Sequence, residues 1–190
     1  MSIFLSMLKK AMSKIEIEET LNGKGDFVQI DYLTRFLKEN PPIDIKRFVY
    51  YKLAVIYEKK CLFSEAAKMY ENMAIISIAF SEKIKNYVKE TELFIKAGLF
   101  DRADEAMKKA MSDANANQRA EIYFSIKTFY KNQAEIYERE LRKNNAAKIY
   151  EKLLEMNLQE SERQEIKKNL LFLYEKLGKF RESDKLKRLG

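Results

Sequence analysis

The side chains that could carry chemistry are few in this sequence, and they form no catalytic set. The chain of 190 residues has no His and a single Cys, Cys61. Without His there is no His general base, no Ser–His or Cys–His nucleophile pair, and no Glu-x-x-His ligand set for a di-iron site. Asp and Glu total 29, so carboxylate pairs arise by chance. We therefore expect a protein that is not an enzyme and that has no catalytic residue, cofactor or bound metal.

Two short segments offer weak alternatives to that expectation. Cys61 follows Lys59 and Lys60, whose charges could lower the pKa of its thiol and make it reactive. The favoured interpretation is a small apolar residue at a tight turn. The segment 22–25, Asn-Gly-Lys-Gly, lacks both the spacing and the preceding strand of a phosphate-binding loop, and it is interpreted as a helix connector.

Composition and charge suggest the compartment and the fold class. Lys and Arg total 36, so the formal net charge is +7. A lone Cys cannot form an internal disulfide, which favours a cytoplasmic location. No stretch of 18 apolar residues is present, so no membrane span is expected. Five Gly and two Pro are few for the many turns that a β-rich fold requires.

Apolar residues recur at helical spacing along the chain, which predicts an all-α fold. The predicted helices span about 2–20, 27–38, 45–60, 64–79, 81–97, 101–113, 117–142, 145–156, 161–177 and 180–188. The residues expected at helix N-caps are Asp44, Ser64, Ser81, Asp101, Asn144 and Ser161. Ser161 and Gln164 also have the spacing of a capping box.

Breaks in this pattern suggest how the chain is organised. Residues 22–26 and the segment Asn40-Pro41-Pro42 interrupt the helices. We expect 1–42 to form N-terminal capping helices and 43–190 to form helical repeats, all within one compact unit. Residues 1–15 carry Lys without acid, as a targeting segment would, but a first structural helix is the favoured interpretation.

The strongest signal is an internal repeat. Segments 54–71 and 134–151 share nine of 18 residues without a gap. Two weaker copies begin at Phe94 and Tyr174. The repeats align on four anchor aromatics, which are Tyr57, Phe94, Tyr137 and Tyr174. Self-similarity at such spacings is typical of stacked helical hairpins.

Each repeat carries further residues at fixed distances from its anchor. Four residues after the anchor, two copies have Gly98 and Gly178, which are expected to end a helix with positive φ. Nine residues after the anchor stand the small residues Ala66, Ala103, Ala146 and Ser183. A small residue there would let the two helices of a hairpin approach closely.

This combination of aromatic, Gly, aromatic and small residue resembles the tetratricopeptide repeat (TPR), over about residues 46–189. The spacings are longer than in that family, Tyr50, Tyr87 and Tyr130 replace Trp, and the third copy has Leu141 and Lys143 where Gly and an aromatic are typical. Residues 134–141 are also similar to one helix of the soluble NSF attachment proteins (SNAPs), a longer-helix branch of the superfamily.

The resemblance implies a fold and a class of function. The implied fold is a right-handed TPR-like α-solenoid of about four helical hairpins preceded by two N-terminal helices. The implied function is a scaffold or adaptor that binds a peptide or helix of another protein in a concave groove. A SNAP-like adaptor for helical-bundle partners is an alternative.

The residues expected to face that groove lie six and two residues before each anchor. The earlier set is Tyr51, Val88, Lys131 and Lys168, and the later set is Val55, Glu92, Glu135 and Phe172. This surface would be apolar at its N-terminal end and basic at its C-terminal end, which suits a partner of acidic character. Alternatively, residues 1–40 fold back and cover Tyr51 and Val55, and Lys131 and Lys168 are merely solvated.

The C-terminal end suggests a second class of function. Six cations stand against two acids from residue 176 onward: Lys176, Lys179, Arg181, Lys185, Lys187 and Arg188. Such a helix could bind nucleic acid or another anionic surface, without sequence specificity and in a salt-sensitive way. The favoured interpretation is a polar outer face on a terminal capping helix.

Overall fold

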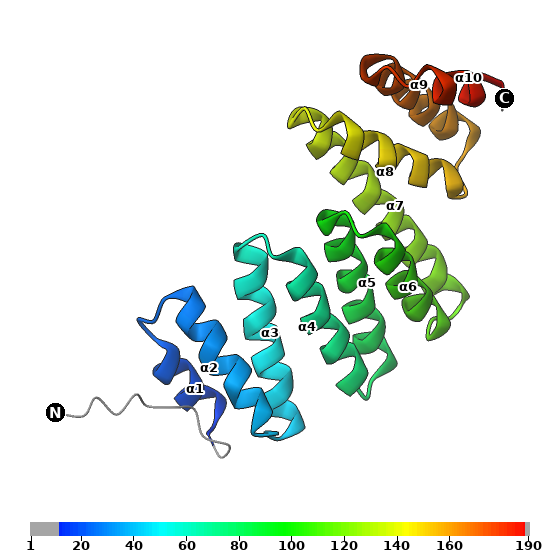
Figure 1. The fold of residues 1–190 in the computed structure, drawn as a ribbon. Helices are drawn as coiled ribbons and strands as arrows, with labels where there is room; N and C mark the ends of the chain where they lie inside the picture. The colour runs from blue at the N-terminus through cyan, green and yellow to red at the C-terminus, as the bar shows by residue number, and fades with distance from the viewer. Residues whose placement is uncertain (1–11, 189–190) are drawn as a thin grey trace. The chain divides into compact units, whose positions relative to one another are not determined.

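The structure is a computed structural model that describes residues 12–188, and within that range all regular structure is α-helical (Figure 1). The all-α expectation is therefore confirmed for these residues. The helices, in chain order, are α1 (Lys14–Leu21), α2 (Asp26–Lys38), α3 (Ile43–Lys59), α4 (Phe63–Ile76), α5 (Phe80–Ala97), α6 (Phe100–Ser112), α7 (Ala116–Arg139), α8 (Lys143–Glu155), α9 (Glu160–Leu177) and α10 (Phe180–Arg188).

The helix at the N-terminus differs from the one predicted over 2–20. Ser13 is extended, and it begins α1 with a capping box: its side chain accepts from the backbone N–H of Glu16, whose carboxylate accepts from the backbone N–H of Ser13 at 2.7 Å. A Ser held this way stands outside the helix, since N-caps have non-helical backbone angles. The remainder of the predicted helix, residues 2–11, lies outside the described residues.

The predicted N-caps are wrong at all six positions. The N-caps of α3, α4, α5, α6, α8 and α9 are Pro42, Leu62, Ala79, Leu99, Arg142 and Gln159. The capping box expected at Ser161 and Gln164 is formed instead by Gln159 and Glu162. At three of the six starts the tight turn of the preceding helix, rather than a Ser or Asp side chain, sets the first residue of the helix.

The same turn closes all four hairpins. The residue four places after each anchor has positive φ: Cys61 (57°), Gly98 (73°), Leu141 (58°) and Gly178 (69°). Its N–H donates to the carbonyl of the residue after the anchor at 2.9–3.2 Å, and the next N–H donates to the carbonyl of the anchor itself at 2.8–2.9 Å. These two bonds define a Schellman motif.

The residue that ends each turn also begins the next helix. Leu62, Leu99, Arg142 and Lys179 each accept, through the carbonyl, a hydrogen bond from the small residue four places on. Those small residues, Ala66, Ala103, Ala146 and Ser183, are all buried, as the repeat predicts. The turn therefore fixes which face of the second helix lies against the first.

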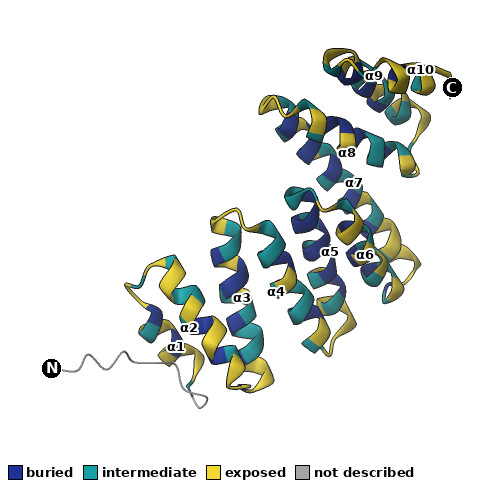
Figure 2. Cartoon of the chain, in the orientation of Figure 1, coloured by how far each residue is buried: buried dark blue, intermediate teal, exposed yellow. Residues whose placement is uncertain are grey.

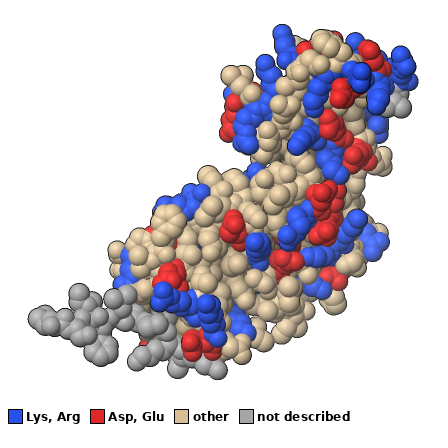
Figure 3. Space-filling model, viewed as in Figure 1, with Lys and Arg blue, Asp and Glu red and all other residues tan. Residues whose placement is uncertain are grey.

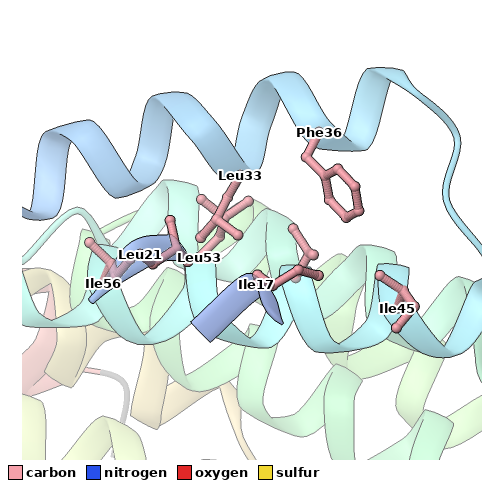
Figure 4. Close-up of a cluster of buried hydrophobic side chains, with 8 residues drawn as sticks. Ile17, Leu21, Leu33, Phe36, Ile45, Leu53 and Ile56 are labelled. Carbon is pink, nitrogen blue, oxygen red and sulfur yellow. The ribbon is translucent and has the colours of Figure 1, made fainter. Parts of the chain in front are cut away.

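The described helices belong to two compact units, residues 1–114 and 115–190. In the first, α3 to α6 follow one another as antiparallel neighbours, each packed along the next (Figure 1). α1 and α2 pack on α3 and share one apolar core with it (Figure 4). That core consists of Ile17, Leu21, Leu33, Phe36, Ile45, Val49, Leu53 and Ile56. The sequence expectation placed the boundary at residue 42 instead, between elements that share this core.

The second unit repeats this packing with α7, α8, α9 and α10. α7 packs along α8, and α8 along α9, while the shorter α10 covers part of α9. Buried residues lie on the sides of α7, α8 and α9 that face their neighbours (Figure 2). Among the candidate site residues of this unit, Glu135 on α7 and Lys168 and Phe172 on α9 are exposed.

Candidate interaction surface

In the first unit, Tyr51 and Val55 lie one turn apart on α3 and remain 52 % and 45 % exposed. α1 and α2 pack against a different side of α3, through Val49 and Leu53. The alternative in which the N-terminal residues cover Tyr51 and Val55 is therefore wrong for the described residues. α3 presents an open apolar strip at this place.

The two other predicted residues of this unit, Val88 and Glu92, lie on α5 and are partly buried. Glu92 is not a free charge. Burial alone would raise the pKa of its carboxyl, but hydrogen bonds from Lys96 at 2.5 Å and Lys89 at 3.1 Å outweigh burial and hold that pKa below its usual value.

A polar network connects these residues to α3 and α4. Lys89 also binds Glu58 of α3 at 3.1 Å, and the hydroxyl of Tyr70 on α4 donates to Glu58 at 3.1 Å. Burial and the Glu58 carboxylate raise the pKa of Tyr70. Glu58 and Glu92 therefore face Lys89 and Lys96. The charges beside the apolar strip thus neutralise each other.

In the second unit, the cationic end expected at Lys131 and Lys168 is weaker than the sequence suggests. Glu162 of α9 accepts from Lys131 at 2.8 Å and from Lys127 at 2.9 Å. These two hydrogen bonds lower the pKa of Glu162 to about 2. Lys131 is thus paired with Glu162 although its side chain is 34 % exposed, and Lys168 is the one cation among the eight predicted residues that forms no ion pair within residues 12–188.

The other two predicted residues of this unit are exposed. Phe172 on α9 is 57 % exposed, and the ammonium of Lys176 lies 5.4 Å from its ring centre. Glu135 on α7 is also exposed. The structure thus brings the predicted residues together in two groups of four, one on α3 and α5 and the other on α7 and α9.

The basic residues near the C-terminus are only partly available to a ligand. The ammonium of Lys179 lies 5.7 Å from the Tyr174 ring centre, and Lys187 lies 3.8 Å from Glu175. Arg181, Lys185 and Arg188 are exposed. In the face that Figure 3 shows, Lys and Arg side chains are interspersed with Asp and Glu.

A buried charged group was missed by the sequence analysis. Glu90 on α5 is 1 % exposed, and its Oε2 has no hydrogen-bond partner among residues 12–188. Burial and the nearby carboxylate of Glu71 raise the pKa of Glu90 to about 7, against the opposing charges of Lys109, 4.0 Å away, and Arg102. Glu105 adds a further carboxylate on the same side.

The repeat contained the signal that identifies Glu90. Four residues before each anchor stand Leu53, Glu90, Gln133 and Leu170, and all four are buried. Alignment on the anchors therefore predicts that Glu90 occupies a core position. The second and third hairpins in chain order have a polar residue at that position, whereas the first and fourth have Leu.

Searches for a metal site and for a membrane span gave no candidate in the described part of the chain. Between residues 12 and 188, no group of three or more Cys, Asp or Glu side chains is placed to hold a metal ion. None of the helices in that range is both long and apolar enough to cross a bilayer.

Comparison with known proteins gives little further identification. No family model matches the chain, and no curated protein matches it. Among solved structures, the chain is similar to BtubC (BKLC) from P. vanneervenii, with 20 % sequence identity over 90 % of this chain and 75 % of that one. The TM-score is 0.37, which is too low to assign a fold family.

Proposed function

We propose that the chain is a TPR-like right-handed α-solenoid of about four helical hairpins behind two N-terminal helices. The recurring Schellman turn and the buried small residue nine places after each anchor support this architecture. In this proposal the protein is a scaffold or adaptor without enzymatic activity. It binds a peptide or helix of another protein along its first helices, which are α3 and α5 in the first unit and α7 and α9 in the second.

The single observation that carries the proposal is the open apolar strip of Tyr51 and Val55 on α3. An apolar pair that stays half exposed although two helices pack on the same element is a candidate contact surface. The ions beside it neutralise each other, so they give orientation rather than net attraction. The bound segment is therefore mainly apolar where it meets α3.

The attraction of this surface for an acidic partner depends on fewer residues than the sequence suggested. Because Glu162 binds Lys131, the attraction for a carboxylate in the second unit rests on Lys168. A partner segment would fit here if it had an acidic residue to bind Lys168 and, next to it, an apolar side chain to pack on Phe172. The proposed ligand is thus an amphipathic segment with one acidic position rather than a strongly acidic one.

The test compares two single substitutions at exposed apolar positions. Val55→Asp places a charge in the proposed groove, whereas Ile78→Asp places it on an exposed loop that lies outside the groove and is 90 % exposed. Each variant and the wild-type chain are immobilised, and proteins co-purified from the native source are identified by mass spectrometry. We expect one protein to be retained by wild type and Ile78→Asp and lost from Val55→Asp.

Salt separates this proposal from binding through the basic C-terminal end. Retention that persists at 500 mM salt supports an apolar groove contact, since charge-driven binding falls steeply with salt. Loss of every retained protein at that salt, or equal retention by Val55→Asp and wild type, contradicts the groove. A SNAP-like role for a helical-bundle partner stays a prediction from residues 134–141.

A further inference from the structure

α6 is the last helix of the first unit, and little apolar surface holds it in place. Its buried residues are three alanines, Ala103, Ala106 and Ala110, which recur at helical spacing and share one side of the helix. α6 packs along α5 (Figure 1). A buried Ala removes much less apolar surface from water than a buried Leu or Phe does. The docking of α6 therefore depends strongly on its polar contacts.

Two cations of α6 make those contacts with α5 and α4. The guanidinium of Arg102 lies 4.8 Å from the ring centre of Phe94, and the ammonium of Lys109 lies 5.6 Å from the ring centre of Tyr87. Both rings belong to α5. Lys109 also binds Glu71 of α4 at 2.6 Å. Arg102 and Lys109 thus connect α6 to both helices.

The buried carboxyl of Glu90 on α5 lies beside this contact. The ammonium of Lys109 is 4.0 Å from Glu90, which is too far for a hydrogen bond. The neighbouring hydroxyl of Thr91 donates to the backbone carbonyl of Tyr87 at 2.9 Å, so its proton is not available to Glu90. The Oε2 atom of Glu90 therefore stays without a hydrogen-bond partner among residues 12–188.

The charges around Glu90 balance only while Glu90 is neutral. They come from both helices that face it, Glu71 on α4 and Arg102, Glu105 and Lys109 on α6. Arg102 lies 3.9 Å from Glu71 and 3.7 Å from Glu105, so two cations serve two carboxylates. Loss of the proton from Glu90 adds a third carboxylate to this cluster without a third cation. A buried charge of this kind is unfavourable unless water reaches it.

We propose that the proton on Glu90 controls the docking of α6: the helix packs on α5 while Glu90 is protonated, and it separates from α5 more often once Glu90 is ionised. Separation admits water to the Glu90 carboxylate and exposes the rings of Tyr87 and Phe94. Acid thus closes this contact and neutral pH loosens it. The inference goes beyond the proposed function, because α6 is not one of the first helices and no partner is required.

The proton affinity of Glu90 sets the pH range of this device. Its pKa is about 7 with α6 docked, because of burial and Glu71, against the usual 4.5 for a Glu in water. The docked state binds the proton more tightly, so docking is favoured most below about pH 4.5. Opening then increases as the pH rises to about 7 and levels off above it. For these two pKa values the opening equilibrium changes by up to about 70-fold between pH 5 and 8.

Hydrogen exchange of the full chain, followed by mass spectrometry at pH 5, 6, 7 and 8, tests this inference. Protection factors remove the intrinsic pH dependence of exchange. We expect those of α6 to fall by at least about tenfold from pH 5 to 8, and those of α4 and α8 by less than about threefold. α8 is the internal reference, since the position of Glu90 is occupied by Gln133 in its hairpin. Constant protection of α6, or an equal loss in α4, overturns the proposal.

Two substitutions assign the effect to Glu90. Glu90→Gln removes the titrating group, and we expect it to abolish the pH dependence of α6 protection. Glu71→Gln leaves the buried side chain intact and frees Lys109 to bind Glu90, so the pH dependence is expected to shrink by at least about threefold. Glu65→Gln, on the same helix but outside the cluster, is the matched control and keeps the wild-type profile.

A wild-type pH profile of α6 in Glu90→Gln overturns the proposal. The Glu71→Gln variant gives a second, independent decision, because Glu71 is partly exposed and its replacement leaves the core unchanged. An unchanged pH profile in Glu71→Gln shows that the charge cluster does not control α6, and this outcome also overturns the proposal.

Discussion

At the scale of single residues, Cys61 and Leu141 adopt the left-handed backbone that Gly98 and Gly178 adopt at the equivalent turns. For a residue with a Cβ this conformation costs roughly 1–2 kcal/mol, because the Cβ approaches the following carbonyl oxygen. The turn is retained in all four hairpins, since its two backbone hydrogen bonds and the packing of the hairpin outweigh that cost. Two of the four turns are therefore strained.

The strain is measurable with a matched pair of substitutions in the second unit. Leu141→Gly relieves the backbone and loses little packing, because Leu141 is 78 % exposed. We expect it to raise the free energy of unfolding by roughly 0.5–1 kcal/mol, after subtraction of the extra entropy of Gly in the unfolded chain. Urea unfolding followed by circular dichroism measures the change.

The reverse substitution, Gly178→Ala, is expected to lower the free energy of unfolding by about 1 kcal/mol. No heavy atom lies within 4 Å of the site of an added Cβ there, so the loss reports the backbone alone. A destabilised Leu141→Gly together with an unchanged Gly178→Ala would show that the turn carries no such strain.

Glu90 gives the first unit a predicted pH dependence. Its pKa is about 7 in the folded protein, against a usual 4.5, so the folded state binds its proton more tightly than the unfolded chain does. The contribution of Glu90 to stability is then fully present below about pH 4.5 and is lost as the pH rises to about 7, by up to about 3 kcal/mol. The carboxylates of Glu71 and Glu105 and the cations of Lys109 and Arg102 set this value.

Glu90→Gln removes the titrating group and keeps the polar shape that Gln133 has at the equivalent position. We expect the variant to be more stable than wild type at pH 8 and nearly equal to it at pH 5, in urea unfolding at pH 5, 6, 7 and 8. Glu121→Gln, at an exposed position of the second unit, serves as the control. An equal difference between Glu90→Gln and wild type at every pH would argue against proton binding by Glu90.

At the scale of helices and hairpins, the small residue on each second helix fixes how closely two helices approach. Ala66 and Ala146 are fully buried, one turn after the N-caps Leu62 and Arg142. Because the turn sets the phase of the second helix, the small side chain always faces the first helix. The turn and the small residue therefore act together.

Ala66→Leu and Ala146→Leu each test this close contact. A larger side chain has no space at these positions, and overpacking is expected to lower the free energy of unfolding by about 1–3 kcal/mol. Ala120→Leu on the exposed side of α7 is the control, for which little change is expected. Thermal unfolding of the three variants measures the effect, and no loss at Ala66 or Ala146 would contradict the register of the repeat.

At the scale of the whole molecule, α1 and α2 complete the core of the first unit. Ile17, Leu33 and Phe36 are buried against α3 (Figure 4). Without these helices, the side chains of Val49, Leu53 and Ile56 would face solvent. A stacked hairpin array needs a cover on its end helices, since each hairpin leaves one apolar side open.

Deletion of residues 1–40 is expected to expose this apolar side of α3 and to cause aggregation. Size-exclusion chromatography with light scattering measures the state of the truncated protein, and binding of a hydrophobic dye measures the exposed surface. The full chain serves as the reference. A truncated protein that stays monomeric and dye-negative would instead make residues 1–40 a separate arm.

Periodicity alone predicted α2 to α10 closely, with every boundary within three residues of the observed one. It succeeded because helical packing imposes its spacing on the sequence throughout the chain. It failed at the N-caps, because a backbone turn such as the one at Cys61 and Leu62 sets the helix start without a polar side chain. Cys61 and Leu141 show that the position in the repeat, rather than Gly, determines the turn.

The sequence by itself determined the all-α class, the turns at Gly98 and Gly178 and the buried small residues, because each follows from spacing along one or two adjacent helices. The tertiary structure decided which charges remain available. Lys131 and Glu92 look exposed in sequence, but Glu162, Lys89 and Lys96 bind them. It also decided that Tyr51 stays half exposed. Such outcomes depend on which helices meet in space, and contacts across residues distant in sequence are not encoded in local periodicity.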